Sequence, residues 1–261
     1  MNSFILFFKK EITELIKTVK GVVLAVVFLL IAITSPIITK LTPEILKWAG
    51  IDGAGEEFAA LMALIPEPNS MMSYAQFFEN FNMMGLLAVI IVFAGIVANE
   101  KSRSTAAYIL TKNISRTQFI LSKFAASVVF VFVSLVIMIS VQILYTNILF
   151  DDNLIELKNV LIFSALLFLY LIFILTFVLF SSAVSKSITP ATFIAFLIFI
   201  AFNIVGAIPR IGKYLPPAVN NFGIITQQTS VGDILPNIIV TVLCSVAFVF
   251  LSVKLFNRQE L

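Results

Sequence analysis

The sequence contains no histidine and a single cysteine, Cys244, which lies inside an apolar run. A zinc site built from histidine and cysteine is therefore excluded, and so is a disulfide within the chain. The same absence rules out the Ser-His-Asp triad, the Cys-His pair and the HExxH motif of metalloproteases. We expect Cys244 to behave as a small apolar residue.

Charged residues are also scarce, because only 12% of the 261 residues are charged while 60% are hydrophobic. Mean hydropathy is +1.08, far above that of a chain that folds in water, so the solvent is lipid. The runs 124–144 and 159–184 are apolar on nearly every side instead of alternating, which favours helices over a membrane barrel. The sequence therefore predicts an all-α integral membrane protein.

Six transmembrane helices are expected, preceded by an amphipathic interfacial helix. The interfacial helix occupies residues 1–20, and the six-span domain occupies residues 21–261. The spans are expected at about 21–39, 82–98, 124–146, 159–184, 188–208 and 236–254. Between them lie a cytoplasmic segment, 99–123, and two outer segments, 40–81 and 209–235. The spans hold no charged residue except Lys254, at the last edge.

The distribution of basic residues predicts the orientation. Most of the 17 lysines and arginines lie before residue 21, in segment 99–123, at Lys186 or at the C-terminal end. The positive-inside rule then places both termini in the cytoplasm of a multi-pass protein of the cell membrane. In residues 3–20, apolar side chains repeat at helical spacing with lysines opposite, as in a helix that lies on anionic lipid. No stretch has the dense basic and aromatic pattern of a nucleic-acid surface, so the expected partner is the lipid membrane.

The two outer segments carry different signals. In segment 40–81, Thr42 followed by Pro43 is typical of a helix start, and apolar residues around 58–65 suggest a second short helix. Segment 209–235 contains several prolines and glycines that break regular structure, yet many of its other residues are apolar. Two interpretations stay open for it: a partial return into the membrane, covered by protein, and a plain surface loop.

No nucleotide-binding or catalytic motif is found. The nearest match to a phosphate loop is Gly212-Lys213, which lacks the upstream glycine, because residue 207 is Ala207, and the following serine or threonine. We therefore expect no enzyme activity and no cofactor or metal bound by this chain. Proton-coupled and sodium-coupled carriers usually have an ionisable residue within the membrane, and these spans have none.

The polar residues within the spans are neutral, and four of them are candidates for a transport path or a subunit contact: Ser127, Ser134, Gln142 and Asn203. Serine hydroxyls more often bond the carbonyl groups of their own helix. The amides of Gln142 and Asn203 are satisfied less completely in that way, so packing and a path or contact both stay open.

Segment 99–123 combines five basic residues with one acid, Glu100, and an apolar set. Ser115 is a suitable cap for a helix that leads into the third span. Two interpretations fit this composition. One is a short cytoplasmic helix on which a partner docks, and the other is a basic loop that only sets topology.

The order of residues in this segment resembles the permease subunits of ABC-2 type transporters. The matching positions are Glu100, Ser104-Thr105, Ile109-Leu110, Ser115-Arg116, Phe119-Ile120 and Lys123. Two positions depart from the family pattern, because Ser104 stands where glycine is frequent and Asn113 where proline is frequent. The six spans, the amphipathic first helix and the large first outer segment are similar to that family as well.

The resemblance implies a permease that pairs with a second, identical or related permease subunit and with separate ATPase subunits, which would bind ATP and Mg. It implies that segment 99–123 and the N-terminal amphipathic helix transmit ATPase closure to the spans, with Glu100 pairing with Arg103 or Arg116. The ATPase-coupling residues implied are Glu100, Arg103, Thr105, Leu110, Ser115, Arg116 and Lys123. The family mostly exports. A hydrophobic or amphipathic substrate, such as a peptide, lipid or drug, is expected because the spans lack charge.

Other functions remain open from the sequence. A channel or carrier that is not driven by ATP would show flux without an ATPase, and a structural or immunity membrane protein would show none. A membrane-embedded enzyme would need a catalytic group in the bilayer, where no charged residue or histidine is found.

Overall fold

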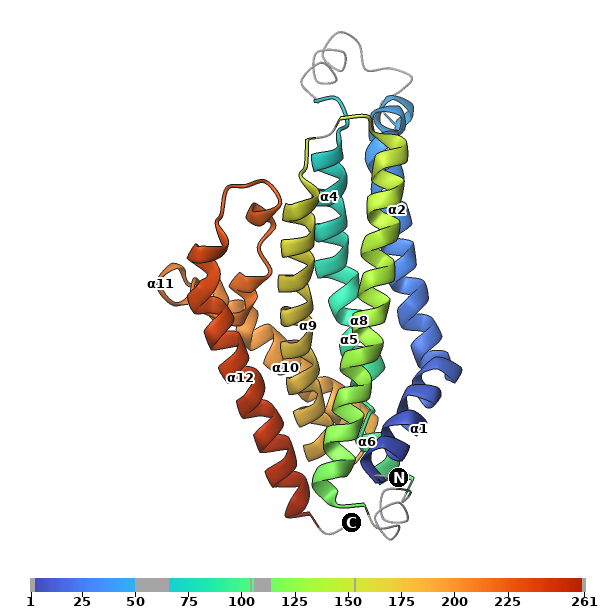
Figure 1. The fold of residues 1–261 in the computed structure, drawn as a ribbon, viewed down its shortest axis with the longest axis vertical. Coiled ribbons are helices and arrows are strands. Elements are labelled where there is room, and N and C mark those ends of the chain that lie inside the picture. The colour runs from blue at the N-terminus through green and yellow to red at the C-terminus, as the bar shows by residue number, and fades with distance from the viewer. Residues whose placement is uncertain (1–2, 50–65, 104, 106–113, 153, 260–261) are drawn as a thin grey trace.

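The protein is described by a computed structural model that covers residues 3–49, 66–103, 105, 114–152 and 154–259. These residues form helices joined by turns, with no strand among them. Six helices are long and apolar enough to cross a membrane, so the chain is an all-α integral membrane protein, as its composition predicts. Figure 1 shows the helices side by side, with both termini at one end of the bundle. We call this the terminal end, and the opposite one the far end.

The amphipathic helix α1 (Ser3–Lys17) meets α2 (Val19–Ala49) at a bend at Thr18. Gly21 allows this corner, because a Cβ atom there would lie 2.9 Å from the Leu15 carbonyl carbon, which is closer than van der Waals contact permits. The expected helix start at Thr42 is wrong. Thr42 and Pro43 lie inside α2, and the Thr42 hydroxyl donates to the Ile38 carbonyl instead of capping a new helix.

The second span begins earlier than the sequence indicates. It consists of α4 (Ser70–Asn80), a π-helical turn η1 (Phe81–Gly85) and α5 (Leu86–Phe93). Asn69 caps α4 by accepting from the Met72 amide, which explains a start twelve residues before the predicted span. Part of the predicted outer segment 40–81 is therefore helix. The short helix expected around 58–65 lies outside the described residues.

A break at residues 94–97 separates α5 from α6 (Ala98–Ser102). The hydroxyl of Ser182 holds this break by accepting from the amides of Val97 and Ala98, at 3.0 Å each. Helix α8 (Arg116–Leu149) begins with a capping box formed by Ser115 and Gln118, so Ser115 is the cap that the sequence predicts. The predicted coupling segment 99–123 therefore ends in the first two turns of a spanning helix.

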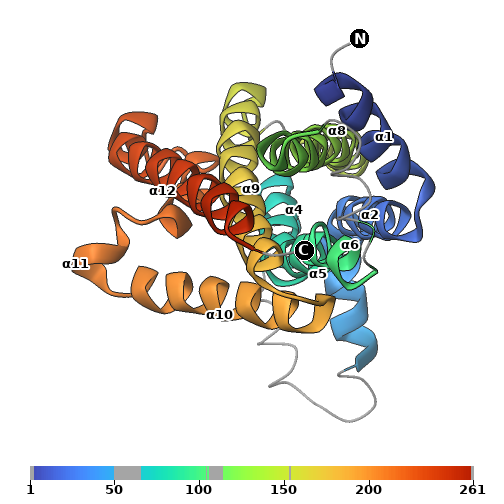
Figure 2. The same ribbon diagram turned by 90° about the horizontal axis from the view of Figure 1, so that it is seen from below.

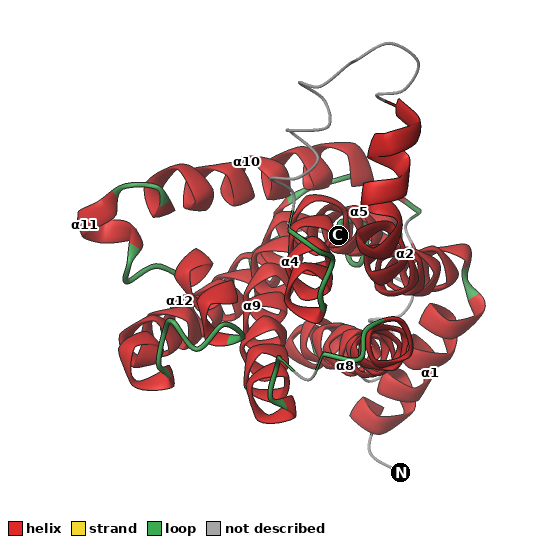
Figure 3. Ribbon diagram, turned by 90° about the horizontal axis from the view of Figure 1, so that it is seen from above, coloured by secondary structure: helices red, strands yellow, loops and turns green. Residues whose placement is uncertain are grey.

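The remaining spans are α9 (Leu157–Val184), α10 (Ile188–Gly206) and α12 (Val231–Asn257). Helices α4, α5 and α9 are the most buried, whereas α10 and α12 expose most of their surface. Figures 2 and 3 show α10 and α12 at the side of the bundle, apart from each other, with α11 (Pro209–Gly212) between them. Phenylalanine rings on α9, α10 and α12 connect these helices: Phe173, Phe177, Phe202 and Phe248.

The broken segment 209–235 packs against protein. It contains α11 and two short 3-10 turns, η2 (Pro216–Val219) and η3 (Phe222–Ile224). Val219, Ile224 and Ile225 are buried in the main hydrophobic core. These three residues have the protein cover that a partial return into the membrane requires, while Ile211 is 52% exposed.

Candidate functional site

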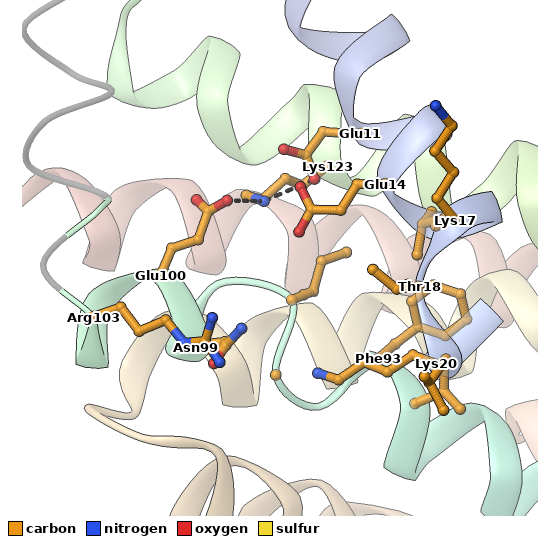
Figure 4. A pocket seen from close by; sticks show the side chains of 15 residues that line it. Glu11, Glu14, Lys17, Thr18, Lys20, Phe93, Asn99, Glu100, Arg103 and Lys123 are labelled. Carbon is orange, nitrogen blue, oxygen red and sulfur yellow. Dashed lines mark hydrogen bonds and ion pairs between the residues drawn. The ribbon is translucent and has the colours of Figure 1, made fainter. Parts of the chain in front are cut away.

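A cluster of buried charges lies at the terminal end of the bundle. Lys123 is on the second turn of α8, on the face that also carries Phe119 and Ile120. Its ammonium group lies 2.8 Å from Oε2 of Glu11 in α1 and 2.9 Å from Oε1 of Glu100 in α6. Figure 4 shows Lys123 between the two carboxylates. All three residues are buried, and Lys123 is only 2% exposed, so one ion cluster joins three helices.

Lys10 forms the outer part of this cluster. Its ammonium group lies 3.0 Å from Glu11, 3.0 Å from Glu14 and 3.4 Å from Glu100. Burial alone would lower the pKa of Lys10, but attraction by Glu11 and Glu100 outweighs it and raises the pKa above the ordinary value. Burial alone would raise the pKa of Glu14, but the hydrogen bond and charge of Lys10 lower it below the ordinary value. The cluster thus favours the charged forms of these two groups.

Aromatic rings surround the Lys123 ammonium group. It lies 5.3 Å from the ring centre of Phe119 and 5.6 Å from that of Phe7. The Phe119 ring is itself stacked on Phe256 of α12, at 5.4 Å between ring centres. Cation–π attraction of this kind is stronger where water is excluded. The rings therefore help to keep a charged lysine inside an otherwise apolar end of the bundle.

Two further basic residues bind carbonyl groups at the same end. The guanidinium group of Arg116 donates to the carbonyls of Phe256, Asn257 and Gln259, at 3.3, 3.1 and 2.6 Å. A cation at the C-terminal end of a helix is favourable, because the carbonyl groups there have no helical partner. Lys101 donates to the Ala183 carbonyl at 2.6 Å and to the Gln259 side chain at 2.9 Å. These contacts connect α8 to the end of α12, and α6 to the end of α9.

A pocket of about 460 Å³ lies beside the charge cluster, between α1, the start of α2 and the α5–α6 break. Its lining includes Glu11, Glu100 and Lys123, and also the basic side chains of Lys20 and Arg103. Figure 4 views this pocket from close by.

Three carboxylates, those of Glu11, Glu14 and Glu100, have oxygen atoms within 4.8 Å of one another, a spacing that suits a metal ion. However, each of these carboxylates is bonded by Lys10 or Lys123. The two ammonium groups supply the positive charge that a metal would bring, so we assign no metal to the cluster.

The structure gives the predicted coupling residues different contacts. Glu100 and Lys123 form an ion pair of 2.9 Å. The expected pairing of Glu100 with Arg103 or Arg116 is wrong, because the buried Lys123 occupies the position next to the carboxylate. Arg116 binds the C-terminal carbonyls instead. Arg103 is exposed at the pocket.

Two more members of that predicted set have structural surroundings. The Thr105 hydroxyl donates to the Glu100 carbonyl at 3.1 Å, and Ser115 caps α8. Leu110 lies outside the described residues, as do Ser104 and Ile109.

Glu11 and Lys10 were not among the predicted site residues. A signal was present, because Glu11 lies one helical turn after Phe7 and one before Leu15, on the side of α1 that faces the bundle. A carboxylate between two apolar residues of one helix face indicates a buried partner.

Three of the four neutral candidates in the spans bond carbonyl groups of their own helix. Ser127 and Ser134 donate to carbonyls four residues earlier in α8, at 2.8 and 2.9 Å. Asn203 is exposed on α10 and donates to the Phe199 carbonyl of its own helix. Gln142 differs, because it is buried and donates to the hydroxyls of Ser73 and Thr146, at 3.2 Å each. Gln142 therefore joins α8 to α4.

Comparison with known proteins gives two findings. The chain is 24% identical over 152 residues to the uncharacterized transmembrane protein YxlG of Bacillus subtilis (strain 168). That match includes 58% of this chain and spans only 57% of the length of the relative. Residues 53–261 match the model of a family described as a protein of unknown function, DUF2705. Because this match covers most of the sequence, including the second to sixth spans, the chain belongs to the DUF2705 family.

Proposed function

We propose that the chain is the transmembrane permease subunit of an ATP-driven transporter of the ABC type, working with separate ATPase subunits and a second permease subunit. The observation that carries the proposal is the buried ion cluster of Glu11, Lys123 and Glu100. It fixes the interfacial helix, the end of the second span and the start of the third span to one another. A partner that pushes on α6 would thus displace α1 and α8 with it.

The resemblance of residues 99–123 to ABC-2 type permeases supports the same function. In this interpretation Glu100 and Lys123 transmit force within the chain, and Ser102, which is exposed near them, contacts the ATPase. ATP and Mg would be held by that partner. Arg116 and Lys101 would keep the ends of α12 and α9 in place during the movement.

Export of a hydrophobic or amphipathic substrate is the proposed direction and cargo. The six candidate spans are strongly apolar, and their charged residues, apart from Glu79 within the second span, lie toward the helix ends. Such a lining suits a peptide, lipid or drug better than an ion, because moving a bare charge past it would be costly.

The proposed orientation places the terminal end in the cytoplasm of a cell-membrane protein. Single cysteines at Ser102 and Glu67, which are exposed at opposite ends, test it in a Cys244→Ala background. An impermeant thiol reagent added to intact cells should label Glu67→Cys and leave Ser102→Cys unlabelled until the membrane is opened. Labelling of Ser102→Cys from outside would overturn the orientation.

The function itself is tested by purifying the tagged chain from its native membrane in mild detergent and assaying the sample for a bound ATP-hydrolysing protein. Parent protein should retain that partner, and Glu100→Ala should reduce both retention and substrate-stimulated ATP hydrolysis. Ile224→Ala controls for a general loss of stability, because Ile224 is buried in the main hydrophobic core and makes no contact with the charge cluster. Transport by the purified chain alone, without ATP, would indicate a channel or carrier instead. The absence of both substrate flux and an ATPase partner would indicate a structural or immunity protein.

A further inference from the structure

Two cationic side chains enter the pocket beside the charge cluster from opposite sides. Lys20 comes from the first turn of α2, and Arg103 follows the end of α6. Figure 4 shows both head groups directed toward the pocket, which Asn99 also lines. Because they belong to different segments, an anion placed between them would bridge the start of the first span and the end of the second.

Each acidic residue of the pocket already binds a lysine, although Oε2 of Glu100 is buried without a hydrogen-bond partner. Glu11 and Glu100 bind Lys123, and Glu14 binds Lys10. Within the part of the chain that the structure describes, no carboxylate forms an ion pair with Lys20 or Arg103. The positive charge on this side of the pocket is therefore available to a ligand.

The rest of the pocket is shaped for a molecule with both a charged and an apolar part. Leu15, Val92, Phe93 and Ile96 line it next to the basic groups. Gly95 keeps the site open, because a Cβ atom there would lie only 3.0 Å from the Lys20 ammonium nitrogen. Any side chain at position 95 would push Lys20 away from its present place.

The pocket also borders an exposed apolar surface of α2. Val19 lines it and is 77% exposed, and the neighbouring Val22 is 53% exposed on the same apolar helix. Exposed valines on a spanning helix face hydrocarbon, so an acyl chain can lie along α2 while its headgroup enters the pocket.

We propose that this pocket binds an anionic phospholipid, with the phosphate between Lys20 and Arg103 and an acyl chain along the exposed face of α2. Arginine binds phosphate through paired N–H groups, and lysine adds a point charge. The Asn99 amide adds a donor. A phosphatidylcholine fits poorly, because it carries no net charge and its quaternary ammonium would lie beside two cations. The proposal does not rest on ATP-driven transport, since it concerns only lipid and this chain.

The test measures lipid retention by native mass spectrometry. The full chain is purified in detergent and mixed with equal amounts of dioleoyl phosphatidylglycerol and dioleoyl phosphatidylcholine. Parent protein should retain phosphatidylglycerol preferentially. The double variant Lys20→Gln/Arg103→Gln should lose that preference by about tenfold, because each basic residue contributes to attraction of anionic lipid. The matched control Lys47→Gln/Lys213→Gln removes two exposed lysines elsewhere and should behave as the parent.

Further variants keep the outcome clear. Lys20→Arg/Arg103→Lys preserves both charges and should keep the preference, whereas Gly95→Leu should block the pocket and reduce it. An unchanged elution volume and melting temperature show that each variant is folded. Equal retention of the two lipids by the parent would overturn the proposal, and so would full retention by the double glutamine variant. Displacement of the lipid by soluble glycerol 3-phosphate would overturn it in favour of a free-phosphate site.

Discussion

Lys123 and Glu100 are 23 positions apart in the sequence and form a buried ion pair of 2.9 Å. The pair closes a loop that leaves the second span at α6 and returns at the start of α8. Glu11 of α1 binds the same ammonium group from the other side at 2.8 Å. Burying a lysine requires such partners, because an isolated charge in an apolar region is costly.

Glu100→Gln should lower the thermal stability of the purified protein. The substitution removes the negative charge that binds Lys123 and Lys10, while Glu11 still binds both lysines, so we expect a loss of about 1.5–3 kcal/mol. Thermal unfolding in detergent measures it, with the exposed Glu67→Gln as control. The triple variant Glu11→Gln/Glu100→Gln/Lys123→Met should recover much of the loss, because it leaves no buried charge unpaired among the three positions. A single Glu100→Gln variant as stable as the parent would contradict the assignment.

Gln142→Leu should destabilise the contact between α8 and α4. Gln142 donates to the Ser73 and Thr146 hydroxyls, which bond each other at 3.0 Å in a buried site. Removing the amide should cost about 1–2 kcal/mol. Ser140→Ala is a suitable control, since Ser140 is exposed on the same helix and bonds only its own backbone. If Gln142 instead lines a transport path, the variant will change transport at unchanged melting temperature.

Ile224→Asp and Ile225→Asp should each destabilise the protein strongly. The two side chains are 3% and 2% exposed in the core, where a carboxylate would have no built-in partner. Ile211→Asp introduces the same change in the same segment at a position that is 52% exposed, so it serves as the matched control. Comparable melting temperatures for all three variants would show that segment 209–235 is an ordinary exposed loop.

Acid should loosen helix α1. The pKa of Glu14 is lowered in the folded protein, so its contribution is present above its ordinary value of about 4.5 and is lost as the pH falls through the folded value. The pKa of Lys10 is raised, so its contribution is complete below its ordinary value of about 10.5 and is lost only at higher pH. Hydrogen exchange of residues 3–17 should be slow from about pH 5 to pH 10 and relatively faster, after correction for intrinsic rates, below pH 4. In the Glu14→Gln variant, the increase in hydrogen exchange of residues 3–17 below pH 4 should be smaller than in the parent.

The presence of six spans follows from composition and apolar runs, whereas their ends depend on capping and on tolerated breakers. Pro43 is typical of a helix start, yet it lies inside α2, since prolines are accepted within spanning helices when neighbours cover the freed carbonyl. Asn69 starts α4 well before the apolar run begins, because a side-chain cap needs no hydrophobic signal. Such polar extensions are difficult to distinguish from loops in the sequence.

The charge cluster could be predicted only in part. Glu100 and Lys123 stand out as charges next to spans, but nothing in their spacing reveals that Glu11 approaches from a helix about 90 residues earlier. Pairing across the bundle depends on how α1 folds back at Thr18, which is a tertiary property. The roles of Arg116 and Lys101 at carbonyl groups were hidden for the same reason, because backbone acceptors leave no mark in the sequence.

The length of α8 has a mechanical consequence. With 34 residues and neither proline nor glycine, α8 is an unbroken rod of about 50 Å, longer than the hydrocarbon thickness of about 30 Å. Lys123 is fixed near one end of this rod, and Gln142 and Thr146 near the other. The helix therefore acts as a lever: a tilt imposed at the terminal end reappears at the far end, where α4 is attached, with little lost to bending.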